Sequence, residues 1–132
     1  MPYSRKSRQE LLTCSLRLIQ LFNKVDALGF ECTVVEGHRN QAKQNWYYEL
    51  DKSKVQWPDG KHNTIPSEAV DVAPYLNGDV SWDKSHCIYF AGVVNGIAAT
   101  LGVKIRWGGN WDMDAEVITD QDFQDLVHFE QV

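Results

Sequence analysis

The first predicted element is a long N-terminal helix, because apolar residues recur there every three or four positions. Ser7 followed by Glu10 is a capping-box pattern that opens a helix. Gly29 is typical of the position just past a helix C-terminus. The apolar positions between these signals are Leu11, Leu12, Leu18, Ile19, Phe22 and Val25.

Two more helices follow from similar periodicity. Residues 40–52 place Ala42, Trp46 and Leu50 four positions apart, so these side chains stack on one face of a helix. Residues 83–101 form the second long helix, which has several aliphatic side chains available for burial and a glycine directly after it.

The other regular segments are expected to be strands, bounded by turn residues. Asn77-Gly78 is a strong signal for a two-residue hairpin, and the proline- and glycine-containing stretch 54–66 is expected to be a loop. The predicted strands are residues 30–36, 69–76, 79–82, 103–107 and 127–131. Helices packed on a small, mostly antiparallel sheet make this an α+β domain.

Length and charge limit the class of protein. With 132 residues the chain is expected to be a single domain, residues 1–132, and its net charge of −5 provides no basic stripe for nucleic acid. No apolar run reaches the roughly 20 residues that cross a bilayer. The basic N-terminus is not followed by the apolar stretch of a secretory signal peptide. We therefore expect no nucleic-acid partner and no membrane anchor.

The candidate metal ligands are His62, Asp71 and His128. Two imidazoles and one carboxylate make a plausible zinc site, and three protein ligands leave a fourth position for water, as in catalytic zinc sites. Asp71 stands in an otherwise apolar strand, where a buried carboxylate is costly unless a cation compensates it. The three cysteines lack CxxC spacing, so we expect reduced thiols and no thiolate zinc site.

The strand around His128 carries further candidate chemistry. Side chains alternate along a strand, so His128 and Glu130 face one way while Phe129 faces the other, toward the core. Asp125 stands three residues before His128, where a general base could sit. Glu130 is expected either to orient a ligand histidine or to be an exposed strand carboxylate. The remaining histidines, His38 and His86, are expected to be structural or solvent-facing.

Three segments resemble a known family of zinc peptidases. Residues 61–74 resemble the first zinc motif of D-alanyl-D-alanine carboxypeptidase-like peptidases, and within that family they are similar to the phage L-alanyl-D-glutamate endopeptidases that serve as endolysins. Residues 125–130 resemble the second motif, and Gly37-His38-Arg39 with Gln44 resembles the Gly-x-Arg…Gln segment upstream. The resemblance covers about residues 7–132.

The resemblance implies a hedgehog/D-Ala-D-Ala-peptidase-like fold and Zn²⁺ held by His62, Asp71 and His128, with Asp125 as the catalytic base. It implies that the substrate is the stem peptide of bacterial peptidoglycan, cleaved at its L-alanyl-D-glutamate bond during phage-induced host lysis. An enzyme of this kind would be made in the host cytoplasm and reach the cell wall with help from another protein. We expect a monomer without a separate cell-wall-binding domain.

Some assignments have alternatives. Arg39 is expected to hold the substrate carbonyl oxygen or a carboxylate, or else to form a surface salt bridge with Glu36. Core packing is expected for most of the aromatic residues Trp46, Tyr47, Tyr48, Trp57, Trp107 and Trp111. An acidic loop could bind a second, hard cation, although a solvated loop is favoured; its residues are Asp112, Asp114, Glu116, Asp120 and Asp122.

Two other functions fit the same motifs. A D-alanyl-D-alanine carboxypeptidase would trim a terminal residue instead of cutting within the stem peptide. A non-catalytic zinc-stabilised binding domain would keep the metal ligands, but an aspartate in the base position, Asp125, argues against it.

Overall fold

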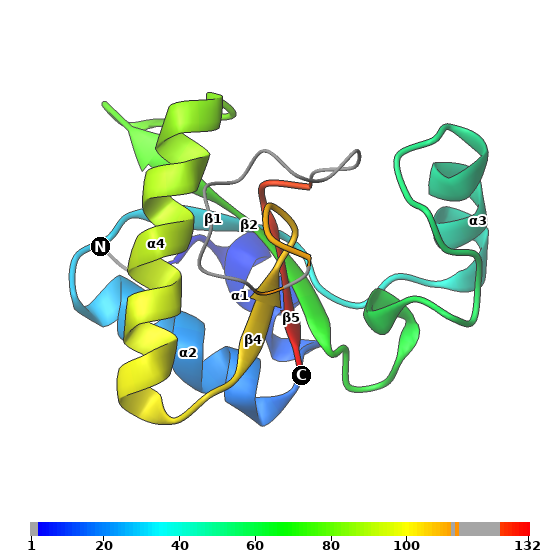
Figure 1. The fold of residues 1–132 in the computed structure, drawn as a ribbon, viewed down its shortest axis with the longest axis horizontal. Coiled ribbons are helices and arrows are strands. Elements are labelled where there is room, and N and C mark those ends of the chain that lie inside the picture. The colour runs from blue at the N-terminus through cyan, green and yellow to red at the C-terminus, as the bar shows by residue number, and fades with distance from the viewer. Residues whose placement is uncertain (1–2, 112, 114–124) are drawn as a thin grey trace.

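The computed structural model describes residues 3–111, 113 and 125–132, and within them it contains four helices and one sheet (Figure 1). The helices are α1 (Arg5–Leu12), α2 (Leu16–Ala27), α3 (Gln41–Glu49) and α4 (Lys84–Leu101), with a 3-10 turn, η1 (Lys61–Asn63). The strands are β1 (Cys32–Glu36), β2 (Ala69–Leu76), β3 (Asp79–Val80), β4 (Ile105–Trp107) and β5 (His128–Gln131).

The sheet confirms the expected α+β architecture. Its strands run in the order β1-β2-β5-β4, with β3 paired to β2, and each of these pairs is antiparallel. The central neighbours β2 and β5 are separated by more than fifty residues in sequence, so the sheet brings the middle and the end of the chain together. This pairing places Asp71 directly opposite His128.

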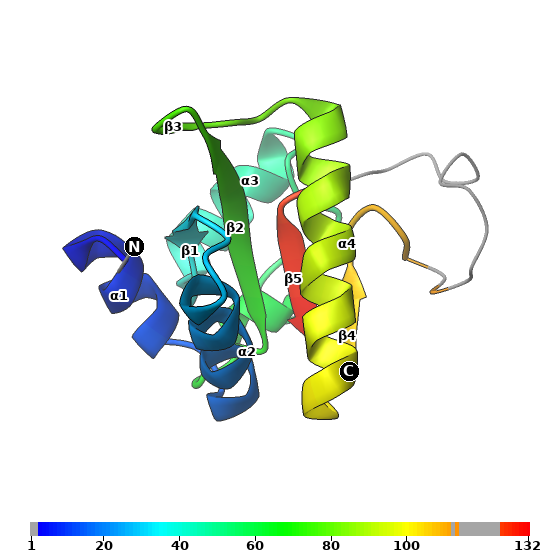
Figure 2. The same cartoon turned by 90° about the vertical axis from the view of Figure 1, so that its left-hand side faces the viewer.

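The core lies between the sheet and the helices α2 and α4, which Figure 2 shows side by side. Phe129 of β5 is fully buried and meets Phe22 of α2 and Phe90 of α4 edge-on, with ring centroids 5.5 and 6.2 Å apart. Because strand side chains alternate, His128 and Glu130 face the opposite side of the sheet. Phe129 belongs to the core whereas His128 and Glu130 line a pocket, so the predicted alternation along this strand is confirmed.

The single long helix predicted at the N-terminus is wrong, because the chain breaks at Cys14. The Ser15 side chain accepts a hydrogen bond from the backbone N–H of Leu18 and caps a new helix there. The break is used for pairing: Ser15 N–H donates to the carbonyl of Ser67, and Ser67 N–H donates to that of Thr13, both at 2.8 Å. The interruption thus anchors the segment that leads into β2.

The helix predicted at residues 40–52 is confirmed as α3, but its stacked apolar side chains do not face the core. In α3, Ala42, Trp46 and Leu50 are all exposed, and the buried residue is Gln44. Figure 1 shows α3 standing apart from the helices that cover the core. Its inner face meets polar groups instead of a hydrophobic core, so hydrogen bonds hold it in place.

The longest described helix, α4, spans 18 residues. Across the part of the chain that the structure describes, neither this helix nor any other combines the length and apolar character needed to cross a membrane.

Candidate metal centre and active site

Three elements bring the predicted metal ligands together. His62 comes from η1, Asp71 from β2 and His128 from β5. His62 Nε2 lies 3.2 Å from Asp71 Oδ1 and 3.2 Å from His128 Nδ1, and the last two atoms are 3.4 Å apart. Each residue thus offers one ligand atom, and these atoms lie within 4.8 Å of one another.

The outer nitrogen of each histidine is committed to an acceptor. His62 Nδ1 lies 2.7 Å from the carbonyl oxygen of Gly37, and His128 Nε2 lies 2.8 Å from Glu130 Oε1. A carbonyl can only accept, so His62 Nδ1 carries a proton. Hydrogen bonds from His128 and Arg106 outweigh burial and lower the pKa of Glu130 to about 2, so this carboxylate also accepts.

The hydrogen bonds of these outer nitrogens determine which kind of ion the centre can hold. With a proton on each outer nitrogen, the inner nitrogens of neutral His62 and His128 both present lone pairs, and they face each other and the Asp71 carboxylate. Three electron-pair donors at such distances, two of them on buried histidines, repel unless a positive charge lies between them. Two imidazoles, each oriented by a second acceptor, and one carboxylate are a donor set that fits zinc.

A proton can supply that positive charge when no metal does. Burial works to lower the pKa of His128, but its hydrogen bonds to Asp71 and Glu130 raise that pKa to about 9. Burial works to raise the pKa of Asp71, but the charge of His62 and the hydrogen bonds from both histidines hold it well below its usual value. Metal and proton therefore compete for the same position.

Gly37 is required because the chain passes very close to α1 there. A Cβ at Gly37 would lie 2.4 Å from the carbonyl oxygen of Glu10 and 2.2 Å from Thr13 Oγ1. Only glycine lets this segment pass, and its own carbonyl then receives the His62 proton. The glycine of the Gly-x-Arg segment thus contributes directly to the orientation of a candidate ligand.

Arg39 lies beside the centre and forms the expected salt bridge with Glu36, together with contacts to Gln44 and Asp71. It is buried; its Nε donates to Glu36 Oε1 at 2.6 Å, and its Nη2 donates to Asp71 Oδ2 at 3.4 Å. Asp71 Oδ1 remains directed at the two histidines. Glu36 also pairs with Lys43, and the guanidinium lies 4.5 Å from the ring centroid of Tyr47. The salt bridge with Glu36 is therefore present, but it is buried.

Gln44 connects Arg39 to the wall of the pocket, a structural role that the sequence did not reveal. Its Oε1 accepts hydrogen bonds from Arg39 Nη1 and Asn63 Nδ2, at 3.0 and 3.1 Å. Its Nε2 donates to Ser53 Oγ and to the carbonyl oxygen of Val55, at 2.9 and 2.7 Å. All four hydrogen-bonding positions of this buried amide are used.

Asp125 lies beside the three ligand atoms. Its Oδ2 is 4.0 Å from His128 Nδ1, and the side chain is only 30% exposed. Burial, together with the negative charge of Asp71, raises the pKa of Asp125 to about 6. Its backbone is fixed by Gly108, whose carbonyl accepts from Asp125 N–H at 3.0 Å. A carboxyl with a pKa near neutrality can both take up and release a proton.

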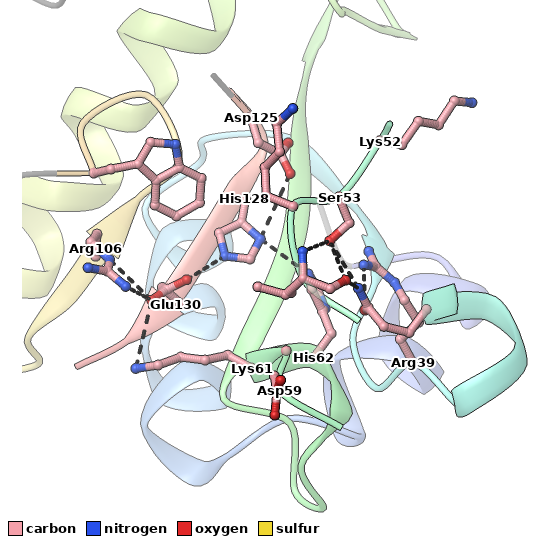
Figure 3. A pocket seen from close by; sticks show the side chains of 15 residues that line it. Arg39, Lys52, Ser53, Asp59, Lys61, His62, Arg106, Asp125, His128 and Glu130 are labelled. Carbon is pink, nitrogen blue, oxygen red and sulfur yellow. Dashed lines mark hydrogen bonds and ion pairs between the residues drawn. The ribbon is translucent and has the colours of Figure 1, made fainter. Parts of the chain in front are cut away.

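These residues open into a pocket of about 480 Å³ (Figure 3). Arg39, His62, Asp125 and His128 line it, together with the segment 52–55. Trp111 also lines the pocket, with its ring 5.3 Å from that of His128. The expectation of core packing for most of the six aromatic residues considered above is wrong: only Trp107 of these is buried, whereas Trp46 and Tyr48 are exposed.

The remaining sequence expectations have different outcomes. His38 and His86 lie outside the triad, and His86 Nδ1 is instead 2.6 Å from Ser81 Oγ. Glu130 is buried against His128, as expected for a residue that orients a ligand. The acidic residues considered for a second cation lie outside the described residues; they are Asp112, Asp114, Glu116, Asp120 and Asp122.

Comparisons with known proteins found a family model that matches the chain, a similar curated protein and a solved structure with the same fold. The family model described as phage L-alanyl-D-glutamate peptidase matches residues 1–132. The L-alanyl-D-glutamate peptidase of Escherichia phage T5 is 24% identical over 116 residues, which are 86% of this chain and 84% of that protein. The crystal structure of the Serratia marcescens L-Ala D-Glu endopeptidase ChiX shares the fold, with a TM-score of 0.78 and 22% identity over 100% of this chain and 90% of that chain.

The competition between metal and proton predicts a pH-dependent zinc affinity. Because the raised pKa of His128 keeps it protonated below about pH 9, binding must displace one proton. Between pH 7 and 8.5 we expect the zinc dissociation constant to fall about tenfold per pH unit. Competition with a chelator of known affinity measures this. A zinc affinity that does not change over this range would contradict the proton competition. The Glu130→Gln variant should shift the pH dependence of the zinc affinity to lower pH.

The approach of Asp125 to Gly108 predicts a glycine requirement. A Cβ at Gly108 would lie 2.0 Å from the Asp125 carbonyl oxygen, so Gly108→Ala should destabilise the fold by about 1–3 kcal/mol and displace Asp125. Gly92 in α4 is the matched control, because nothing lies within 4 Å of its Cβ position. Gly92→Ala should stabilise by about 0.5–1 kcal/mol. Urea unfolding compares the two variants, and equal effects on stability would contradict the close approach of Asp125 to Gly108.

Proposed function

The chain belongs to the phage L-alanyl-D-glutamate peptidase family, and from this premise we propose that it is a zinc-dependent endopeptidase that hydrolyses the L-alanyl–D-glutamate bond of peptidoglycan stem peptides. The observation that carries the proposal is the convergence of His62 Nε2, Asp71 Oδ1 and His128 Nδ1 beside Asp125 in one pocket. The names of the phage T5 relative and of ChiX support the same bond as the substrate.

In the proposed mechanism, His62, Asp71 and His128 hold the metal. Zinc, when bound, supplies Lewis acidity that lowers the pKa of water and polarises a carbonyl group. Asp125 takes the proton of the attacking water and returns it to the leaving amide nitrogen. Its raised pKa, near neutrality, supports both transfers. The burial that raises the pKa of Asp125 therefore suits this residue to both proton transfers.

Arg39 contributes positive charge on the far side of Asp71. Its hydrogen bond to Asp71 Oδ2 keeps that oxygen away from the triad and leaves Oδ1 facing the histidines. The guanidinium lines the pocket, where it stabilises negative charge that develops on the carbonyl oxygen. Glu36 and Gln44 hold it there by accepting from Nε and Nη1.

The biological role is proposed from the family description. We infer that this catalytic domain opens the bacterial wall during phage-induced lysis, after it leaves the host cytoplasm with help from another protein. Lysis of outer-membrane-permeabilised cells by the purified protein tests this role. Loss of lysis with a chelator and its return with added zinc would support a metal-dependent enzyme.

The base assignment predicts that Asp125→Asn separates metal binding from catalysis. This variant should keep one zinc per chain, because the three ligand residues are intact, and should lose activity by about 10²–10⁴-fold. Asp59→Asn is the matched control, since Asp59 also lines the pocket and lies outside the triad. Zinc is measured by atomic absorption and turnover on purified cell wall. Normal turnover by Asp125→Asn would remove Asp125 from the base role.

The cleaved bond distinguishes the proposal from its two alternatives. Mass spectrometry of digested peptidoglycan should reveal new L-alanine C-termini and D-glutamate N-termini. Release of free D-alanine would instead identify a D-alanyl-D-alanine carboxypeptidase. Zinc-dependent folding without any turnover would identify a non-catalytic zinc-stabilised domain.

A further inference from the structure

The pocket has a charge opposite to that of the whole chain. The protein carries a net charge of −5. Among the described residues that line the pocket, basic side chains outnumber acidic ones by five to three. The basic residues are Arg39, Lys52, Lys54, Lys61 and Arg106, and the acidic ones are Asp59, Asp125 and Glu130. Such a concentration of positive charge favours an anionic ligand.

Two of these cations form one wall with Glu130. Arg106 of β4 lies directly opposite Glu130 of β5 in the sheet register. Its Nε and Nη2 both donate to Glu130 Oε2, at 3.2 and 2.7 Å. Lys61, which precedes His62, brings its Nζ to 3.7 Å from the same oxygen and also donates to the carbonyl oxygen of Gln131. Figure 3 shows both cations reaching Glu130 beside His128.

The positive charge on this wall exceeds its negative charge. One carboxylate, Glu130, serves two cations and also accepts from His128 Nε2. The hydrogen bonds to Glu130 use the Nε and Nη2 atoms of Arg106, and within residues 3–111, 113 and 125–132 its Nη1 has no hydrogen-bond partner. The Arg106 side chain is 37% exposed, and its guanidinium carbon lies 5.7 Å from the ring centroid of Trp111, at the pocket wall.

The proposed substrate carries an anion close to the bond that is cut. In a stem peptide the chain continues from the γ-carboxyl group of D-glutamate, so the α-carboxylate stays free. It is attached to the carbon next to the leaving nitrogen. Any enzyme that cuts this bond must therefore accommodate a carboxylate close to its reacting atoms, and burying that charge without a cation would be costly.

Resting on the proposed function, we propose that Arg106, assisted by Lys61, binds the α-carboxylate of the D-glutamate residue and so selects this bond. The planar guanidinium offers the fork of donors that suits a carboxylate. Arg106 is also close to the reacting centre, because a single residue, Glu130, separates it from His128.

The other cations of the pocket are less suited to this role. Arg39 already has a proposed role at the carbonyl oxygen, and its Nε, Nη1 and Nη2 donate to Glu36, Gln44 and Asp71. Lys52 extends away from the side-chain cluster in Figure 3. Lys54 is exposed on the segment held by Gln44, on the Arg39 side of the pocket, and is therefore the residue to test as the alternative.

The test compares two stem peptides that differ only at this group. One carries D-glutamate with its free α-carboxylate, and the other carries the α-carboxamide, D-isoglutamine. For the zinc-loaded wild-type enzyme we expect kcat/KM to be at least about tenfold higher for the carboxylate peptide, as for a charge-assisted hydrogen bond. Arg106→Gln should reduce this ratio to about one, Lys61→Gln should reduce it partly, and Arg106→Lys should retain part of it.

Using the ratio separates recognition from a merely structural role. If Arg106 only held Glu130 and His128 in place, its loss would weaken zinc binding and lower kcat/KM equally on both peptides. Lys104→Gln is the matched control, because Lys104 lies two positions earlier and does not line the pocket. That variant should leave the ratio unchanged.

The outcomes also separate this assignment from the proposed function. Equal cleavage of both peptides by the wild type would overturn the carboxylate assignment and leave the endopeptidase intact. A ratio that survives Arg106→Gln but collapses in Lys54→Gln would place the carboxylate on the other wall and likewise overturn it. Cleavage of neither peptide would remove the proposed function and this assignment with it.

Discussion

The structure depends on the meeting of two imidazole nitrogens and one carboxylate oxygen in a buried position. His62 Nε2, His128 Nδ1 and Asp71 Oδ1 lie 3.2–3.4 Å apart. Because the outer nitrogens donate to Gly37 and Glu130, the inner atoms would present only lone pairs to one another. The arrangement is stable only with a positive charge among them, either a metal ion or a proton.

The fold supplies that arrangement through its sheet. Antiparallel pairing of β2 and β5 puts Asp71 opposite His128. Glu130, two residues farther along β5, is paired with Arg106 of β4 and supports His128. Alternation sends Phe129 into the core, so the strand that carries the chemistry is fixed by hydrophobic packing on its other face. A rigid scaffold thus positions groups that repel one another.

The sequence predicted the parts of this arrangement that local patterns determine. Alternation around Phe129, the hairpin at Asn77-Gly78 and the α+β class follow from periodicity and turn chemistry. The break at Ser15 and the exposed apolar face of α3 could not be predicted in the same way. The break depends on pairing with Ser67, which is distant in the chain, and the exposure of α3 depends on the four hydrogen bonds of Gln44, which no apolar periodicity records. Arg106 gave no signal in the sequence for the same reason.

The most direct measurement of the central claim is anomalous X-ray scattering at the zinc edge from crystals of the zinc-loaded protein. We predict one strong peak, bounded by His62 Nε2, Asp71 Oδ1 and His128 Nδ1. Glu130 should still accept from His128 Nε2 in that crystal. A peak elsewhere, or an ion bound through His128 Nε2 in place of Nδ1, would contradict it.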